Sequence, residues 1–576
     1  MKISRIIIKK FRSIEKADIW VGSINAIVGQ NNSGKSCLLR ALNAFFNYEK
    51  EEDAFKNGLH SFRPRTVSKI EVHFEDFDRA RMPARYIHGN KVIIEASFTQ
   101  NAIGCSRSIK YKSGREWTQD DGCLASVKTQ IEFILIPPNR DANALDQAES
   151  SVLQLLVEEK MKEATESRDN YTVKFKSAIQ YLESNALKKI ASDAKAEFPV
   201  KKPFNITIKY SKDISYKDFL PDVGIQIDES GLSHPLIECG SGIQSLTIIS
   251  LYNLLGKARD ENIIIGLEEP ETNLHPQAQK ELIDYFKELV STENILQFFF
   301  TTHSSQMIDQ VDHTEIVSFK KVADSSRGFI SKVNKLPENF FDKYDLDDFK
   351  YYQFYRYRNS DFFFSSYIVV TESKNEVEVI KKIGETSGKD YEVNGLSYLN
   401  LEGVDKAKYT IYLLKELDIP FSLIVDKDFF FPYANDDYAS SLNPKGFPQY
   451  KAEYKDEDLV KDIIPSATDR EKLLRNPNVN HTEKLNLLES HNIVSMRWSL
   501  DLDLVAINGA REEYFRILRT PLADQTSQYL TAQRKAIKKI DRILRVFGSL
   551  EPANWPYSYS RIKKVMNKIA RDLDHT

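Results

Sequence analysis

The sequence predicts a chain of the α/β class, organised as two α/β domains. Residues 24–46 read as an apolar strand, a glycine-bounded loop and an amphipathic helix. Residues 263–271, IIIGLEEPE, read as an apolar strand that ends at adjacent carboxylates. Residues 367–428 read as apolar strands that alternate with helical segments and end at acidic residues. A length of 576 residues has room for roughly two to four domains, which agrees with this division.

The loop after the first strand has the pattern G-x-x-x-x-G-K-[ST]. Its glycines allow backbone N–H groups to close around phosphates, Lys35 can reach the β and γ phosphates, and Ser36 can ligate Mg²⁺. A surface turn with an incidental lysine is the alternative, but it does not explain the flanking strand and helix. We therefore expect ATP binding, through Gly29, Asn32, Ser33, Gly34, Lys35 and Ser36.

The composition indicates a globular protein. Apolar residues make up 41% of the chain and charged residues 28%, and the net charge is −3, so nucleic acid would have to bind at a local basic patch. The four cysteines form no C-x-x-C pair, which argues against a zinc site or a disulfide framework. Residues 1–13 lack the apolar core of a signal peptide, and no apolar run approaches the length of a membrane span. We expect a cytoplasmic protein.

The N-terminal part is rich in predicted strands, at residues 3–8, 14–20, 69–75, 91–98 and 130–137. A strand-rich lobe of this length is not typical of small GTPases and is similar to ATP-binding-cassette ATPases. Gln100 and Gln130 are both candidates for the Q-loop glutamine of such ATPases. Residues 145–195 have helical periodicity among many charged residues and predict a helical insertion, which is either a dimerisation arm or a solvated hairpin.

Two further motifs continue the cassette pattern. Ser241 and Gly242 begin a helical run and resemble the signature motif, which contacts the γ-phosphate held by the opposite subunit. The strand of residues 263–267 delivers Glu268, which we expect to hold Mg²⁺, and Glu269, which we expect to polarise the attacking water.

Past this strand, Asn273 and His275 stand where a D-loop belongs. His303 follows the apolar strand at residues 296–300 and suits the switch histidine that touches the γ-phosphate. The order of the motifs implies a composite site that needs two heads, hence a dimer. The opening INAIVGQNNSGKS resembles the ATPase heads of DNA-repair and chromosome-maintenance proteins of the SMC, RecF and RecN kind.

Acidic residues mark a second centre. Glu372 and Asp426 each follow an apolar strand, and Glu376 opens the helix between them. The carboxyl ends of parallel strands meet at one sheet edge, where clustered carboxylates hold the divalent ions that clamp the oxygens of a phosphodiester. Solvated strand ends are the alternative for any single acid. The candidate metal ligands are Glu372, Glu376, Asp426 and Asp428, with Asp501 and Asp503 at the end of a later apolar patch.

This centre resembles a Toprim domain, although V-T-E-S-K-N-E departs from V-E-G-x-[ST]-E at Ser373 and Asn375. A cassette ATPase followed by a Toprim domain resembles the overcoming-lysogenisation-defect (OLD) family, which includes the Gabija nuclease subunit and retron-associated effectors. The resemblance implies an ATP-controlled DNA endonuclease that uses Mg²⁺ or Mn²⁺, with two ions in the Toprim site, and that forms dimers or tetramers. It also implies a helicase or a reverse transcriptase with its msDNA as a partner from the same defence locus.

The resemblance further implies a lysine beside the scissile phosphate. Lys535 is the first candidate, with Arg534 and Lys538 as rivals. The surrounding segment is the main basic concentration of the chain and suits a DNA backbone, although a solvated helix face explains it equally well. The residues expected to bind DNA are Arg534, Lys535, Lys538, Lys539 and Arg542.

The expected division is residues 1–140 and 226–330 for the two parts of the ATPase, 141–225 for the insertion, 331–365 for a connector, 366–510 for the Toprim core and 511–576 for a basic helical region. The function predicted is an ATP-regulated, metal-dependent DNA endonuclease in antiphage defence. The alternative is a DNA-repair ATPase whose C-terminal domain is a binding module. A topoisomerase or primase lacks a recognisable tyrosine domain or zinc module here.

Overall fold

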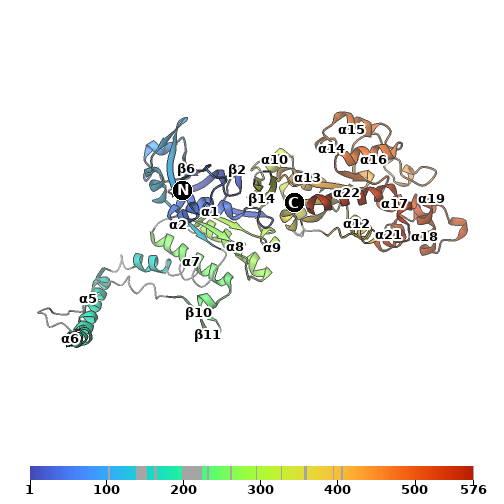
Figure 1. Ribbon diagram of the computed structural model, residues 1–576. Coiled ribbons are helices and arrows are strands. Elements are labelled where there is room, and N and C mark those ends of the chain that lie inside the picture. The colour runs from blue at the N-terminus through green and yellow to red at the C-terminus, as the bar shows by residue number, and fades with distance from the viewer. Residues whose placement is uncertain are drawn as a thin grey trace. The chain divides into compact units, whose positions relative to one another are not determined.

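The computed structural model describes residues 1–101, 104–137, 152–160, 165–196, 224–229, 232–259, 262–292, 295–325, 327–355, 360–392, 395–403 and 406–574. The chain forms two compact units (Figure 1). The first comprises Met1–Ile27 and Gly34–Glu315, and the second comprises Val28–Ser33 and Ile316–Thr576. We call them the ATPase unit and the C-terminal unit.

A parallel sheet forms the centre of the ATPase unit. Its strands β3 (Ile24–Gly29), β13 (Ile295–Thr301), β12 (Asn262–Glu268) and β9 (Ile131–Ile136) lie side by side in that order. These strands are almost continuously apolar because both faces of a parallel sheet are buried. Helix α1 (Ser36–Phe46) packs against this sheet and buries Leu38, Leu42 and Phe45.

A second, antiparallel part of the same sheet also belongs to this unit. Its order is β8-β7-β6-β4-β1-β2, with β5 on β6. The strands are β1 (Lys2–Phe11), β2 (Ile14–Trp20), β4 (Val67–Glu75), β5 (Ile87–His88), β6 (Lys91–Asn101), β7 (Gly104–Ser113) and β8 (Glu116–Gln119). Ile6 and Ile8 on β1 and Ile70 and Val72 on β4 are fully buried, so the apolar alternation of these strands faces the core.

Helices complete the ATPase unit. They are α2 (Tyr48–Lys56), α3 (Gly122–Lys128), α7 (Ser241–Arg259), α8 (Pro276–Thr292) and α9 (Ser305–Ile308). The described part of the predicted insertion is helical, at residues 152–160, in α5 (Thr165–Leu182), in a π-helical turn at Glu183–Leu187 and in α6 (Lys188–Ala196). Met161, part of the expected helical stripe, lies outside the described residues. A hairpin of β10 (Gln226–Glu229) and β11 (Leu232–Pro235) follows.

The C-terminal unit opens with the hairpin of β14 (Ile316–Asp324) and β15 (Gly328–Lys335). Helices α10 (Phe340–Lys343) and α11 (Asp348–Tyr355) and the 3-10 helix at Ser360–Phe364 follow. Phe340 and Tyr351 are fully buried and meet edge to face, with ring centroids 5.9 Å apart. The described part of this aromatic stretch is therefore packed core.

A four-stranded parallel sheet, in the order β17-β16-β18-β19, forms the core of this unit. Its strands are β16 (Tyr367–Thr371), β17 (Leu396–Asn400), β18 (Phe421–Val425) and β19 (Ile493–Ser495). Helix α12 (Lys374–Thr386) joins β16 to β17, and α13 (Ala407–Glu416) joins β17 to β18. The predicted alternation of strands and helices is confirmed.

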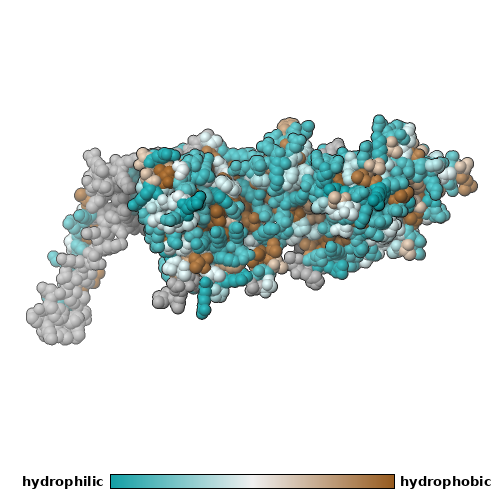
Figure 2. All heavy atoms as spheres, turned by 90° about the horizontal axis from the view of Figure 1, so that it is seen from above, coloured by the Kyte–Doolittle hydropathy of each residue, from teal (hydrophilic) through white to brown (hydrophobic). Residues whose placement is uncertain are grey.

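The remaining helices of this unit include α16 (His481–Ser490) and α22 (Tyr557–Asp574), which pack against β19. The others are α14 (Glu457–Ile463), α15 (Ala467–Leu474), α17 (Leu500–Val505), α18 (Asn508–Leu518), α19 (Ser527–Ala532), α20 (Arg534–Ile537) and α21 (Ile540–Gly548). On the face shown in Figure 2, hydrophobic residues lie scattered among hydrophilic ones. None of the helices in the described ranges is both long and apolar enough to cross a membrane.

Candidate functional site

The phosphate loop has the backbone that its sequence predicts. Gly29 has φ +141°, and a Cβ there would lie 2.1 Å from the Phe319 carbonyl oxygen, so no larger residue fits. Gly34 and Asn32 also have positive φ, at 96° and 59°. The hydroxyl of Ser33 is buried and has no hydrogen-bond partner among the described residues. Ser36 begins α1, whose first turn contains no acid, so the positive helix end is free to meet an anion.

Lys35 is 7% exposed and lies among acidic groups of the ATPase unit. Burial lowers the pKa of Lys35 to about 8, and the charges of Glu269 and Glu271 oppose that shift. Burial also lowers the pKa of His303, and the charge of Lys35 adds to the effect. The structure therefore brings Lys35, Glu269 and His303 within electrostatic range of one another.

Glu271 positions the histidine, a role that the sequence did not reveal. Its Oε1 accepts a hydrogen bond of 2.7 Å from the backbone N–H of His303. Burial raises the pKa of Glu271, and the bond to His303 opposes the rise. Glu269 has φ +48°, and its N–H donates to the Thr301 carbonyl oxygen at 3.1 Å, which fixes the start of the loop after β12.

Glu268 is buried and lies against a cation. The Nε of Arg40, on α1, is 3.2 Å from its Oε1. Arg40 also reaches Oε1 of Glu51, at 3.2 Å, and Oε2 of Glu51 lies 2.8 Å from Nε2 of His60. These four residues, Glu268, Arg40, Glu51 and His60, form a chain of two ion pairs and one hydrogen bond that we call the Arg40 network. No motif in the sequence indicated it.

The signature motif and the D-loop candidates lie on α7 and on the segment after β12. Ser241 begins α7, and its side chain is outside what the structure describes. A Cβ on Gly242 would lie 1.9 Å from Cδ2 of Leu274, so the close packing of α7 against the segment after β12 requires glycine there. Asn273 and His275 are exposed on that segment.

Of the two Q-loop candidates, Gln130 is buried, and its amide bonds the backbone of Asp78 in both directions, at 2.8 and 3.2 Å. This engagement gives Gln130 a structural role. The Gln100 side chain lies outside what the structure describes.

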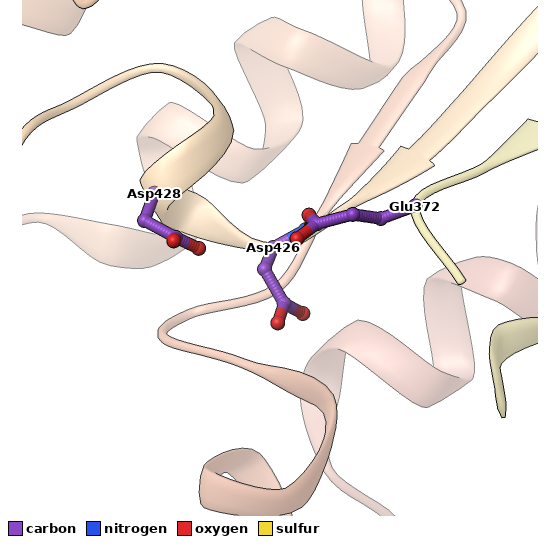
Figure 3. A group of neighbouring side chains, drawn as sticks. All are labelled: Glu372, Asp426 and Asp428. Atoms are coloured by element: carbon purple, nitrogen blue, oxygen red, sulfur yellow. The ribbon is translucent and has the colours of Figure 1, made fainter. Parts of the chain in front are cut away.

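Three carboxylates of the C-terminal unit form a cluster that fits a metal ion. One oxygen each of Glu372, Asp426 and Asp428 lies within 4.8 Å of the other two. In Figure 3, Glu372 and Asp428 extend toward each other from opposite sides, with Asp426 between them. Glu372 follows β16 and Asp426 follows β18, which are hydrogen-bonded neighbours. The predicted meeting of acids at the carboxyl edge of the sheet is present for these three residues.

The electrostatics of the cluster support the fit. Burial raises the pKa of Glu372 to about 7, and the Asp428 carboxylate adds to the rise. Burial raises the pKa of Asp426 well above its usual range, and Glu372 adds to it. Hard divalent cations bind oxygen ligands of this kind and relieve both effects.

Glu376 lies beside the cluster but also caps α12. Its Oε2 accepts hydrogen bonds from the N–H of Ser373 at 2.7 Å and from the Ser373 hydroxyl at 2.8 Å. The Ser373 hydroxyl in turn accepts from the N–H of Asn375, which completes a capping box. The departure from the Toprim pattern at Ser373 therefore has a structural reason, and it leaves Oε1 of Glu376 as the oxygen free of this cap.

Asp501 and Asp503 lie outside the group of three. Asp503 is buried, and its oxygens accept from the N–H groups of Arg497 and Trp498, both at 2.9 Å, and from the Ser558 hydroxyl at 2.6 Å. It anchors the segment between β19 and α17. Asp501 accepts from the Ser499 hydroxyl at 2.8 Å, and its Oδ2 lies 3.7 Å from Nε of Arg534.

The basic segment is divided between two short helices, and its members differ in role. Arg534 is half-buried, and its guanidinium stacks over Tyr438 at 4.7 Å in addition to its pairing with Asp501. Lys538 is exposed, and its charge lowers the pKa values of Glu372 and Glu376 against the larger effect of burial. Lys535 and Lys539 are exposed, and Arg542 donates to the Ala536 carbonyl oxygen at 3.0 Å. Among these residues, Lys538 is the one whose charge acts most on the acidic cluster.

Comparison with known proteins gives two family matches. Residues 1–132 and 126–308 match the AAA ATPase domain, and residues 363–428 match the Toprim domain of overcoming lysogenization defect protein-like proteins. Endonuclease GajA of Bacillus cereus (strain VD045) is 24% identical over 458 residues, which cover 74% of this chain and 75% of that protein.

Two further relatives carry the family name. The OLD nuclease of Thermus scotoductus is 22% identical and covers 74% of this chain and 82% of that protein. The Old nuclease of Escherichia phage P2 is 20% identical and covers 74% and 78%. Among solved structures, an SMC head domain from Thermotoga maritima aligns with 58% of this chain and all of that chain, at 15% identity and a TM-score of 0.31.

The two family matches contain the residues of the two candidate sites. The ATPase match covers more than half of the chain and contains Lys35, Glu268 and His303, and the Toprim match ends at Asp428. The fold class predicted from the sequence is therefore confirmed. The chain belongs to the AAA ATPase domain family, and its C-terminal unit contains a Toprim domain similar to that of overcoming lysogenization defect protein-like proteins.

Proposed function

We propose that the protein is an ATP-regulated DNA endonuclease that depends on Mg²⁺ or Mn²⁺. The observation that carries the proposal is the closely spaced cluster of Glu372, Asp426 and Asp428 at one sheet edge, in which Asp426 is buried and the other two are partly buried. Bound divalent ions, two in the mechanism we favour, would polarise the phosphodiester and activate a water molecule. GajA and the two OLD relatives are named nucleases, which supports the same chemistry here.

The chain's own residues have distinct roles in this proposal. Glu372, Asp426 and Asp428 would hold the ions, with Glu376 contributing its free oxygen. The N–H of Asp426 donates to Oε2 of Glu372 at 3.1 Å, which fixes the direction of that carboxylate. Lys538 would neutralise charge that develops on the phosphate in the transition state. Lys535, Lys539 and Arg542 would bind the DNA backbone.

Asp501 and Arg534 would act as a pair. Because Arg534 lies 3.7 Å from Asp501, its cation offsets a carboxylate that burial would otherwise make costly. We propose Asp501 as an outer ligand of the metal site and Asp503 as the positioning residue of the segment that carries it.

The direct test measures nicking of supercoiled plasmid by purified protein with Mg²⁺ or Mn²⁺. Wild type should nick the plasmid, and Glu372→Gln should not, because the isosteric amide removes one ligand charge. Asp436, an exposed aspartate in the same unit, supplies the control Asp436→Asn, which should cleave normally. Equal cleavage by wild type and Glu372→Gln would show that the acidic cluster does not carry the activity. ATPase activity without cleavage under either metal would favour the repair ATPase.

The ATPase unit would supply regulation. Lys35 and the buried Ser33 hydroxyl would bind ATP phosphates, Glu268 and Ser36 would hold Mg²⁺, Glu269 would orient water, and His303 would contact the γ-phosphate. Ser241 and Gly242 of a second copy would complete the site, so we propose ATP-dependent homodimers or homotetramers.

The assembly is measurable by light scattering. Glu269→Gln with ATP should retain the larger species, and Lys35→Ala should not form it. An antiphage role, in company with a helicase or a reverse transcriptase, is the cellular setting that we propose from the relative GajA.

A further inference from the structure

A cavity of about 870 Å³ lies in the C-terminal unit, beside the segment that holds Asp426. Its lining includes Lys445, Arg497 and Arg511, together with Phe447 and Trp498. No aspartate or glutamate is among its lining residues in the part of the chain that the structure describes. In a chain with 83 acidic and 80 basic residues, a cavity with cations and no acids is selective for an anion.

Arg497 is an exposed cation of this cavity. Its guanidinium lies 4.2 Å from the centre of the Trp498 ring, and that ring stacks on Phe447 with centroids 4.2 Å apart. Arg497 is exposed, and its guanidinium has no hydrogen bond or ion pair to any described residue. This stacking on Trp498 fixes the planar guanidinium of Arg497 in the lining of the cavity. Nucleobases stack on guanidinium planes of this kind, and phosphates bind to their edge.

The segment of residues 496–500 connects the cavity to the acidic cluster. The Trp498 carbonyl oxygen accepts from the N–H of Lys427, which stands between Asp426 and Asp428. The N–H of Leu500 donates to Oδ1 of Asp426 at 3.1 Å. Trp498 lines the cavity and is two residues from Leu500, and residues two positions apart lie within about 7 Å of each other, so one short segment joins the cavity to the acidic cluster.

The volume limits what can enter. Cavities of about 300–1,000 Å³ enclose ligands of the size of one or two nucleotides and cannot enclose a base-paired duplex. We propose that this cavity binds unpaired nucleotides of one DNA strand immediately beside the cleaved phosphodiester, with Arg497 as the stacking residue and Lys445 as a phosphate contact. The proposal deepens the proposed function and rests on it, since it makes DNA with a gap or a flap the favoured substrate.

The test compares a fluorescent duplex that contains a short single-stranded gap with the same duplex fully paired. Anisotropy is measured with Ca²⁺, which supports binding without cleavage. Wild type should prefer the gapped DNA. Arg497→Ala should bind it roughly tenfold more weakly, with little change for paired DNA, and its salt dependence should fall by about 0.7 in log–log slope.

Two variants sharpen the result. Arg497→Lys keeps the positive charge but loses the planar guanidinium. Its salt dependence should therefore match that of wild type, while its preference for gapped DNA should be lost as in Arg497→Ala. Arg475 is an exposed arginine that does not line the cavity, and Arg475→Ala should behave as wild type. All variants should keep the Mn²⁺-dependent rise in Tm, which shows that the acidic cluster is intact.

The outcomes separate the two proposals. If wild type cleaves DNA and Arg497→Ala binds gapped DNA as tightly as wild type, the cavity assignment is wrong and the nuclease stands. If wild type cleaves no DNA but Arg497→Ala loses the preference for a gap, the cavity assignment stands and the nuclease is wrong.

Discussion

At the scale of single residues, Lys538 and Lys535 differ in their effect on the pKa of Glu372 in the acidic cluster. The main influences on the pKa of Glu372 include the charge of Lys538, which lowers it against the larger effect of burial, and do not include Lys535. We predict that Lys538→Ala reduces the cleavage rate roughly 10²–10³-fold, the range found when one group that stabilises transition-state charge is removed. Lys535→Ala should change the rate only a few-fold and should instead weaken DNA binding. Single-turnover cleavage at saturating protein measures the difference, and equal losses in both variants would refute it.

The raised pKa of Glu372 predicts how the stability of the folded protein depends on pH. Its ordinary pKa of 4.5 rises to about 7 in the folded protein, so the folded state holds the proton more tightly than the unfolded state. Without metal, Glu372 therefore lowers stability progressively between about pH 4.5 and 7, and the full loss is present above pH 7.

Glu372→Gln removes this effect. In EDTA its Tm should exceed that of wild type at pH 8, by about 2–4 °C for each kcal/mol relieved, and should match wild type near pH 4.5. Addition of Mn²⁺ should raise the Tm of wild type more than that of Glu372→Gln. Differential scanning fluorimetry provides both measurements, and a wild type indifferent to Mn²⁺ would contradict the metal site.

At the scale of elements, helix α12 depends on its capping box. Ser373→Ala removes the side-chain cap and should cost about 1 kcal/mol of stability. The response to Mn²⁺ should persist, because Oε1 of Glu376 and the three clustered acids remain. Ser387 at the other end of α12 supplies the control, since its buried hydroxyl has no hydrogen-bond partner among the described residues. Ser387→Ala should leave the Tm unchanged or higher, and an equal loss in both variants would argue against the cap.

The phosphate loop likewise depends on one residue type, because position 29 has room only for glycine. Gly29→Ala places a Cβ 2.1 Å from a carbonyl oxygen, so the loop must shift and ATP binding should be lost. Gly89 has φ +65°, and nothing lies within 4 Å of the position that a Cβ would take there, so Gly89→Ala costs only backbone strain of about 1–2 kcal/mol. Binding of a fluorescent ATP analogue should therefore survive Gly89→Ala and fail in Gly29→Ala.

At the scale of the whole molecule, ATP should act on cleavage through Lys35. We predict that ATP changes the rate of plasmid cleavage by wild type and leaves the rate of Lys35→Ala unchanged, since that variant cannot hold the β and γ phosphates. Comparison of the wild-type rates with and without ATP gives the sign of control. A lower rate with ATP, together with a higher rate in Lys35→Ala than in ATP-bound wild type, means that ATP restrains the nuclease. An ATP response that persists in Lys35→Ala would place the nucleotide elsewhere.

The sequence predicted the candidate site residues that directly follow an apolar strand. The loop of Gly29–Ser36 and the acids after β16 and β18 could be predicted because strand ends and glycine spacing are local patterns. The partners of Asp501 and Asp503 could not, because Arg534 and Ser558 are distant in sequence and meet them only in the folded protein. The Arg40 network was missed because Glu268 is distant from Arg40 in sequence, and the cavity was missed because its lining comes from several separate segments.

The Arg40 network has a consequence for timing. A cation already lies 3.2 Å from Glu268, so Mg²⁺ must compete with a guanidinium for that carboxylate. We expect this competition to slow the assembly of a hydrolytic centre and to lengthen the life of the state with intact ATP. Any control that ATP exerts on DNA cleavage would then last as long as that state does.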